Sequence, residues 1–185
     1  MKTFEEMIEP LLISEGGFQD DPVDHGNWTG GRRGVGENKG TNWGISAARY
    51  PDLDIKALTR EVATELYRRD FYRKYNMHRL PDHLKYIVFD HGVNCGPRRA
   101  IRMLQMLAGV RRDGIIGPIT IAASRNVSID DYSDARAQYY KRLVQHWPTH
   151  EKYLRGWLAR VSISRRKASL AFEPSPIVKV NNHTA

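Results

Sequence analysis

The first hydrophobic pattern of the chain lies in residues 3–15. Apolar side chains recur there at intervals of three and four, which places them on one face of a helix. They are Phe4, Met7, Ile8, Leu11 and Leu12. Thr3 and Glu6 have the spacing of a capping box, which indicates a helix start. Pro10 removes one backbone donor, so we expect a kink or a late start, and the pair Gly16-Gly17 predicts the end of the helix.

Residues 18–42 show no helical period and predict irregular hairpins. Glycines alternate there with polar and β-prone residues, at positions 26, 30, 31, 34, 36 and 40. A loop of this length in a compact domain is usually functional or disordered. Trp28, Val35 and Trp43 are of the type expected to be buried, which favours a functional region.

Beyond Pro51 the apolar period is helical almost throughout. We expect helices at residues 60–75, 82–93, 97–108, 118–125, 130–146 and 151–167. The core of the later helices should include Ile101, Leu104, Leu107, Ile115 and Ile116. The fold class is therefore mainly α, a helical body with a small N-terminal β-hairpin region, and the two lobes should flank a cleft. Residues 173–185 contain two prolines and little apolar surface, so we expect a flexible tail.

The charge of the chain indicates a polyanionic partner. The 185 residues include 29 Lys and Arg against 21 Asp and Glu, a formal net charge of +8. Nucleic acid, anionic membranes and bacterial wall polymers all fit this charge. The basic residues are scattered over many predicted helices and no recognition module is visible, which argues against specific nucleic-acid binding.

Other composition features exclude several classes of protein. The single cysteine, Cys95, cannot form an intramolecular disulfide or a cysteine-built zinc site, and we expect it to be a buried thiol. No nucleotide or metal motif occurs, so we expect no cofactor and no metal. Residues 1–17 have only short apolar clusters, so we expect neither a signal peptide nor a transmembrane segment.

Two carboxylates are candidates for acid and base chemistry. Glu15 follows Leu11 and Leu12 by four and three positions, so a helix reaching that far would continue the apolar stripe with a carboxyl group. Burial disfavours the charged form of a carboxylic acid and keeps it able to donate a proton. A solvent-facing glutamate at the helix end is the alternative. Asp24 could face Glu15 after the chain folds back, and glycoside hydrolysis requires such a pair of carboxylates. Asp20 and Asp21 compete with Asp24 for this role, and their alternative role is turn capping.

Two stretches resemble a known family. Residues 14–46 read SEGGFQDDPVDHGNWTGGRRGVGENKGTNWGIS, with an EGG motif, a following Pro-x-Asp and a terminal Gly-Ile-Ser. Residues 89–120 read FDHGVNCGPRRAIRMLQMLAGVRRDGIIGPIT. The first stretch resembles the N-terminal signature of glycoside hydrolase family 108, the phage-endolysin muramidases. The second is similar to the peptidoglycan-binding region that often follows that signature.

This resemblance implies an α+β lysozyme-like fold and a role for each matching residue. Glu15 of the EGG motif would be the catalytic acid of an N-acetylmuramidase, and Asp24 its partner. A threonine would position the attacking water. Thr29 matches by its distance from Asp24 and Thr41 by its distance to Gly44-Ile45, and we favour Thr41. We expect one lysozyme-like domain over residues 1–172, with a catalytic lobe at 1–80 and a helical lobe at 81–172.

Further residues are candidates for substrate binding. Trp28 and Trp43 could contact sugar rings. Arg32 and Arg33 lie in a glycine-rich segment that could form a basic lip over a cleft, and a solvated mobile loop is the alternative. Asn94 could bind substrate amides, although capping the next helix is the more common use of such a residue.

We therefore expect a phage-type endolysin that hydrolyses the β-1,4 bond between N-acetylmuramic acid and N-acetylglucosamine and lyses the host cell. The alternatives are a non-catalytic binder of cell wall or nucleic acid and, with the same site, a lytic transglycosylase. The expected partner is the peptidoglycan glycan strand, and the protein should be a monomer. It should be made in the host cytoplasm and act on the wall after release, which we expect to depend on a holin.

Overall fold

The computed structural model describes residues 3–172 and, within them, the backbone but not the side chains of residues 14, 15, 171 and 172. The expected tail, 173–185, lies outside the described residues. The α-helices are α1 (Phe4–Glu15), α2 (Arg60–Tyr67), α3 (Asp82–Cys95), α4 (Pro97–Leu107), α5 (Pro118–Ser124), α6 (Ile129–His146) and α7 (Glu151–Phe172). The strands are β1 (Thr41–Asn42) and β2 (Ile45–Ser46). Short helical turns are η1 (His25–Asn27), η2 (Arg68–Arg73), η3 (Met77–Arg79) and η4 (Pro148–His150).

The mainly α fold class is confirmed, and each expected helix is found. The Thr3–Glu6 capping box is present, with Glu6 Oε2 accepting from the Thr3 N–H at 2.8 Å and Thr3 Oγ1 from the Glu6 N–H at 3.3 Å. The predicted late start of α1 was wrong, because the helix begins at Phe4 and runs through Pro10. The helix expected at 60–75 is α-helical only to Tyr67 and continues as the π-helical turn η2.

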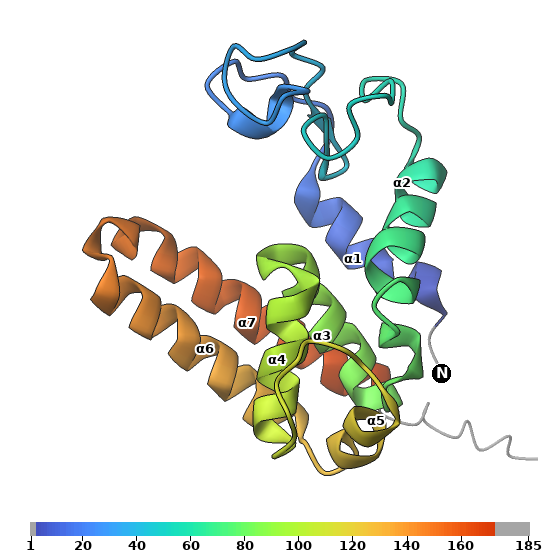
Figure 1. Ribbon diagram of the computed structural model, residues 1–185, viewed down its shortest axis with the longest axis vertical. Coiled ribbons are helices and arrows are strands. Elements are labelled where there is room, and N and C mark those ends of the chain that lie inside the picture. Colours follow the sequence, from blue (N-terminus) through green and yellow to red (C-terminus); the bar gives the residue numbers. More distant parts are fainter. Residues whose placement is uncertain (1–2, 173–185) are drawn as a thin grey trace, which may run out of the picture.

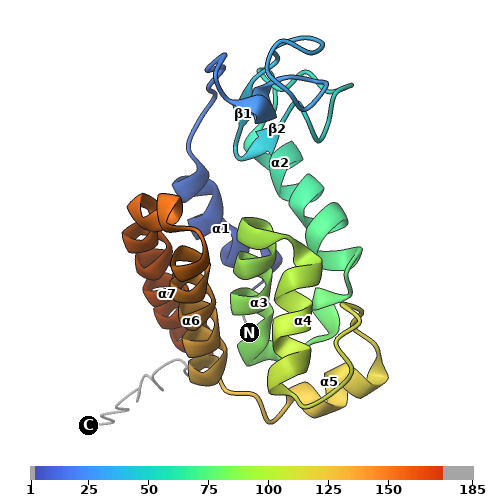
Figure 2. The same cartoon turned by 60° about the vertical axis from the view of Figure 1, so that its left-hand side comes forward.

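The helices form one body around a continuous core (Figures 1 and 2). α6 and α7 pack side by side as an antiparallel pair, and α3 lies between α4 and α7. The core draws buried side chains from α1, α2, α3, α4, α6 and α7, among them Ile8, Leu12, Tyr67, Ile87, Phe89, Leu104 and Tyr132. Ile115 was expected in this core but is exposed, since it lies in the turn before α5, where only its neighbour Ile116 points inward.

The region between α1 and α2 forms a separate lobe of loops at one end of the molecule (Figure 1). Its sheet is one antiparallel pair, with Thr41 opposite Ser46 and Asn42 opposite Ile45. Trp43 and Gly44 form the connecting turn, and both have positive φ, 53° and 73°. Such a turn matches the twist of a two-residue hairpin. The Trp43 indole holds it in place by donating to the Leu58 carbonyl at 3.2 Å.

Candidate functional site

The candidate site lies where α1 ends and the loop lobe begins. Buried Met7, Ile8, Leu11 and Leu12 fix α1 on the core. Ion pairs connect Glu9 of α1 to Arg60 of α2 and Glu5 to Arg68 of η2. Glu15 is the last residue of α1, and Gly16, at φ 75°, turns the chain out of the helix. The backbone of Glu15 therefore stands at the entry to the loop lobe. The side chain of Glu15 is outside the described part of the structure.

A hydrogen-bonded chain of polar side chains connects Asp24 to Thr41. Asp24 Oδ2 accepts from Gln19 Nε2 at 3.3 Å, and the same Gln19 nitrogen donates to Asn27 Oδ1 at 3.1 Å. The Thr41 hydroxyl donates to Asn27 Oδ1 at 2.7 Å. Gln19 and Thr41 are also paired through their backbones, at 2.9 and 2.8 Å. Two of the predicted site residues, Asp24 and Thr41, therefore belong to one network that begins four residues after Glu15.

Asn27 is the centre of this network, and no motif or periodicity in the sequence marks it. Its side chain is fully buried and donates to Gln19 Oε1 at 2.8 Å and to the Asp21 carbonyl at 2.9 Å. The backbone carbonyl of Asn27 accepts from the backbone N–H groups of Lys39 and Gly40 at 3.0 and 3.1 Å. The Asn27 amide is buried and has all its hydrogen bonds satisfied. Moving a neighbouring residue would break one of these bonds and leave a buried polar group without a partner, so the amide holds its neighbours in place. Asn27 thus ties both sides of the lobe together.

Local backbone geometry explains the orientation of Asp24. Asp24 is the N-cap of η1, and its Oδ1 accepts from the Gly26 N–H at 2.8 Å, which leaves Oδ2 directed to Gln19. Among the competing aspartates, Asp21 caps a turn through the Val23 N–H at 2.9 Å, as expected for a loop aspartate. Asp20 lines a neighbouring hollow of about 560 Å³ within the lobe, which residues 52–56 also line.

Thr29 lies in a different part of the lobe from this network. Its hydroxyl accepts from the Glu37 N–H at 2.9 Å, and its own N–H donates to the Glu37 carbonyl at 2.9 Å. Both groups hold the arms of the glycine-rich loop together. The geometry therefore separates the two threonines that the sequence left as alternatives, because only Thr41 shares a network with Asp24.

The other predicted contact residues have different surroundings. Trp28 donates from its indole to the Pro22 carbonyl at 3.1 Å, so both tryptophans of the lobe, Trp28 and Trp43, hold loop carbonyls and are only partly exposed. Arg32 and Arg33 are exposed at the tip of the glycine-rich loop. Val35 was expected to be buried but is also exposed, because it belongs to this tip.

Asn94 lies in the helical body, in the last turn of α3. Capping of the next helix was the wrong expectation, since Gly96 is the N-cap of α4 and no side chain caps it. Asn94 Oδ1 instead accepts from the Tyr140 hydroxyl and, at 3.5 Å, from Arg136. The Cys95 thiol is half-buried, not fully buried as expected, and lies 3.2 Å from the same hydroxyl.

A buried ion pair supports this part of the body. Arg136 is fully buried and donates to Asp90 Oδ2 at 2.7 Å, and Arg160 lies 3.1 Å from Asp90 Oδ1. A pair of this kind costs desolvation and is retained only when its hydrogen bonds are satisfied. It connects α3, α6 and α7, the three helices that carry Asn94, Tyr140 and Trp157.

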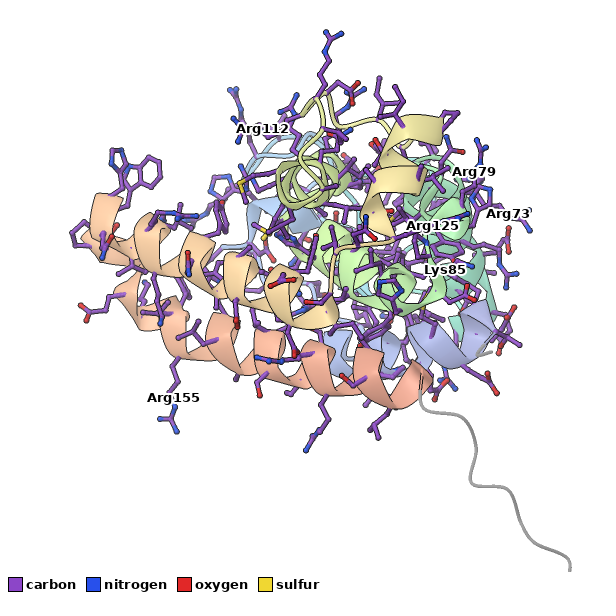
Figure 3. All side chains as sticks on the ribbon, turned by 90° about the horizontal axis from the view of Figure 1, so that it is seen from below. Arg73, Arg79, Lys85, Arg112, Arg125 and Arg155 are labelled. Carbon is purple, nitrogen blue, oxygen red and sulfur yellow. The ribbon has the colours of Figure 1, made fainter. Side chains whose placement is uncertain are left out.

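In Figure 3 the labelled cations Arg73, Arg79, Lys85 and Arg125 gather on one side of the helical body, and Arg112 lies apart from them. The labelled cations Arg73, Arg79, Lys85, Arg112, Arg125 and Arg155 come from six different parts of the chain, and Arg155 stands on α7, away from the others. Among the described side chains, which do not include that of Glu15, no three His, Cys, Asp or Glu residues gather in a way that could hold a metal ion. Within residues 3–172, no helix is long and apolar enough to cross a bilayer.

Comparisons with known proteins agree with this arrangement. The family described as Glycosyl hydrolase 108 matches residues 8–96, which contain most of α1 and the loop lobe. A second family, described as a predicted peptidoglycan domain, matches residues 99–162. The solved structure of Brucella abortus SagA superimposes with a TM-score of 0.73 at 30% identity, covering 93% of this chain and 97% of SagA. The chain belongs to the glycosyl hydrolase 108 family.

This family-108 protein is therefore a glycoside hydrolase that acts on peptidoglycan. The family match spans α1 to α3 and so includes the entire Asp24–Thr41 network. The peptidoglycan match spans α4 to the middle of α7. None of the curated proteins matches the chain.

Proposed function

We propose that this protein is an N-acetylmuramidase of the phage endolysin type, which hydrolyses the β-1,4 bond between N-acetylmuramic acid and N-acetylglucosamine. The observation that carries the proposal is the hydrogen-bonded chain Asp24–Gln19–Asn27–Thr41 at the end of α1, where Glu15 is the last residue. Glycoside hydrolysis needs one carboxylic acid to protonate the leaving oxygen and a second group on the opposite side of the sugar.

In this mechanism Glu15 gives its proton to the glycosidic oxygen as the bond to C1 of the muramic acid breaks. Asp24 stabilises the positive charge that develops on that sugar, since a carboxylate fixed by the Gly26 N–H and by Gln19 needs little reorganisation. A water oxygen then bonds to C1, and one of its protons passes to a carboxylate of the site.

Thr41 is suited to hold that water. Its hydroxyl proton is committed to Asn27 Oδ1 at 2.7 Å. The lone pairs of the Thr41 oxygen therefore remain as acceptors for an O–H of the water. A water that donates to Thr41 keeps its own lone pairs free to attack the sugar.

Mass spectrometry of the products from purified peptidoglycan tests the bond and the reaction. The proposal predicts fragments that end in a reducing N-acetylmuramic acid and have gained one water per cleavage. Fragments with a 1,6-anhydro ring would instead identify a lytic transglycosylase, and reducing N-acetylglucosamine ends would identify cleavage of the other bond. A folded protein that binds the wall and forms no product would be a non-catalytic wall binder.

The endolysin role has a separate test. We propose that the protein is made in the host cytoplasm, is monomeric, and reaches the wall through a membrane lesion made by a partner such as a holin. Expression of the protein alone should leave bacterial cells intact, and permeabilising the inner membrane should then cause rapid lysis. Lysis without permeabilisation would contradict dependence on a holin. A mass in solution well above 21.3 kDa would contradict a monomer.

A further inference from the structure

A ladder of aromatic rings runs along the turn between α6 and α7. Trp157 stacks on Tyr140 with ring centroids 5.1 Å apart and an interplanar angle of 27°. Tyr153 and His150 follow at 5.8 and 6.2 Å from Trp157, and Trp147 lies 6.3 Å from His150. We call Trp147, His150, Tyr153 and Trp157 the aromatic platform. His150 ends η4, and Tyr153 and Trp157 follow in α7 at spacings of three and four residues, which places their side chains next to one another.

The outer rings of the platform are open to solvent. Trp147 is 51% exposed and Tyr153 is 49% exposed, although both are large aromatic side chains. A contiguous set of exposed aromatic rings on a soluble protein usually marks an interaction site. The four platform residues are not members of the hydrophobic core cluster described above.

The inner end of the platform is held rigidly. Tyr140 is buried, and its hydroxyl accepts from Arg136 Nε at 3.2 Å, so the ring beneath Trp157 is fixed by the Arg136–Asp90 ion pair. At the outer end, Trp147 closes α6 by donating its backbone N–H to Leu143 at 2.9 Å and precedes Pro148. A residue before proline has few allowed conformations. The Tyr140 ring and the backbone at Trp147 are therefore held in place before a ligand binds, which lowers the entropy cost of binding.

The charges around the platform match an acidic polysaccharide. Residues 139–157 contain the cations Lys141, Arg142, Lys152 and Arg155 and a single acid, Glu151. The Lys152 ammonium lies 5.0 Å from the Tyr153 ring. Peptidoglycan combines pyranose rings, whose C–H faces stack on aromatic rings, with the carboxylates of the muramic lactyl and peptide groups. The exposed aromatic rings and the Lys152 ammonium beside Tyr153 suit both features.

The position of the platform in the fold and in the sequence also bears on what it binds. In Figure 1 the α6–α7 turn projects sideways from the helical body, and in Figure 2 it lies at the upper end of this helix pair, below the loop lobe. All four platform residues fall within residues 99–162, which match the peptidoglycan domain. We infer that the aromatic platform binds the glycan strand of peptidoglycan, as a second contact separate from the candidate catalytic site. The inference rests on peptidoglycan as the substrate, and it does not depend on which bond is cleaved.

Cosedimentation of the full-length protein with purified, insoluble peptidoglycan sacculi tests this inference. The variant Trp147→Leu/Tyr153→Leu keeps apolar side chains at both positions and removes the flat rings. We expect its affinity for sacculi to fall about tenfold, as for loss of an aromatic anchor. Trp147→Phe/Tyr153→Phe keeps the rings and should stay within about threefold of the native protein. Ile119→Ala, on the exposed surface of α5, is the control for general loss of apolar surface.

Two further readouts keep the inference distinct from the catalytic proposal. Release of sugar ends from short, soluble glycan fragments should be the same in the Leu variant and the native protein, whereas release from sacculi should fall. If the native protein cleaves nothing, the hydrolase proposal fails, and cosedimentation still decides whether the platform binds peptidoglycan. Equal sedimentation of the folded Leu variant and the native protein would overturn the inference, as would an equal loss in the Phe and Leu variants.

Discussion

Thr41 and Thr29 differ in what their hydroxyl groups bind, and this difference can be measured. Thr41→Val removes the hydroxyl from the Asp24 network, and we expect the rate of peptidoglycan hydrolysis to fall about 10- to 100-fold, as expected when a positioned reactant is lost. Thr41→Ser keeps the hydroxyl and should retain most of the rate. The measurement is release of reducing ends at saturating substrate.

Thr29→Val is the matched control for that substitution. It also deletes one loop hydrogen bond, the one from the Glu37 N–H, so both valine variants should lose about 1 kcal/mol of stability. Only Thr41→Val should lose the activity. A larger loss of activity in Thr29→Val would assign the water to Thr29 instead.

Single residues of the site were only partly predictable from the sequence. Asp24 could be selected because paired carboxylates have a known chemistry and a motif surrounds it. Gln19 and Asn27 could not, because their importance comes from contacts across 8 and 14 positions of an irregular loop. No periodicity marks such contacts. The exposed position of Val35 and the bonds of Asn94 were mispredicted for the same reason, since burial and partners in loops and helix ends are set by tertiary contacts.

At the scale of elements, the loop lobe requires a glycine at position 40, next to the backbone pairing of Gln19 with Thr41. Gly40 has φ 80°, and a Cβ there would lie 2.5 Å from the Gln19 carbonyl oxygen. Gly40→Ala should therefore displace the Gln19–Thr41 pairing, lower stability by several kcal/mol and abolish hydrolysis. Thermal unfolding and reducing-end release check both effects.

Gly34 provides the comparison within the same loop. Its φ is 77°, nearly that of Gly40, but a Cβ there would meet no atom within 4 Å. Gly34→Ala should cost only the backbone strain, about 1 kcal/mol, and leave the activity intact. If the two variants lose the same stability and the same activity, close packing at Gly40 is not what holds the site.

The helices were predictable where the hydrophobic period was long. The expected starts of α3, α4, α5 and α7 agree with the structure, and that of α6 differs by one residue. Proline in the first turn and capping residues make helix starts readable. The change from α2 to the π-helical η2 was not predictable, because the backbone hydrogen bonds shift there while the apolar pattern continues unchanged. The two-residue strands are likewise too short to give an alternating pattern.

At the scale of the whole molecule, a buried histidine couples the stability of the helical body to pH. His91 is fully buried on α3, and Tyr132 donates to the Ala100 carbonyl at 3.1 Å, so the Tyr132 oxygen accepts from His91 Nδ1 at 2.8 Å. Burial, helped by the charges of Arg136, Arg99 and Arg160, holds the pKa of His91 well below its usual value. The folded protein therefore keeps His91 neutral.

Unfolding exposes His91, whose pKa then returns to about 6.5. Below that pH the unfolded chain binds a proton that the folded protein does not, so stability falls as the pH falls, by up to about 1.4 kcal/mol per pH unit. We expect melting temperatures to decrease from pH 7.5 to 5.0, and less steeply in His91→Gln. His78→Gln, at an exposed position of η3, is the control and should keep the native slope. Identical slopes in all three proteins would contradict this account of His91.

The central claim is that Glu15, at the end of α1, is the acid that cleaves peptidoglycan. The most direct measurement is the rate of reducing-end release from purified peptidoglycan by the native protein, Glu15→Gln and Glu37→Gln, after circular dichroism has shown all three to be equally folded. Glu37 is an exposed glutamate of the same lobe and serves as the matched control. We predict a loss of about 10²- to 10⁴-fold for Glu15→Gln, the usual contribution of a general acid, and native activity for Glu37→Gln. Native activity in folded Glu15→Gln would contradict the claim.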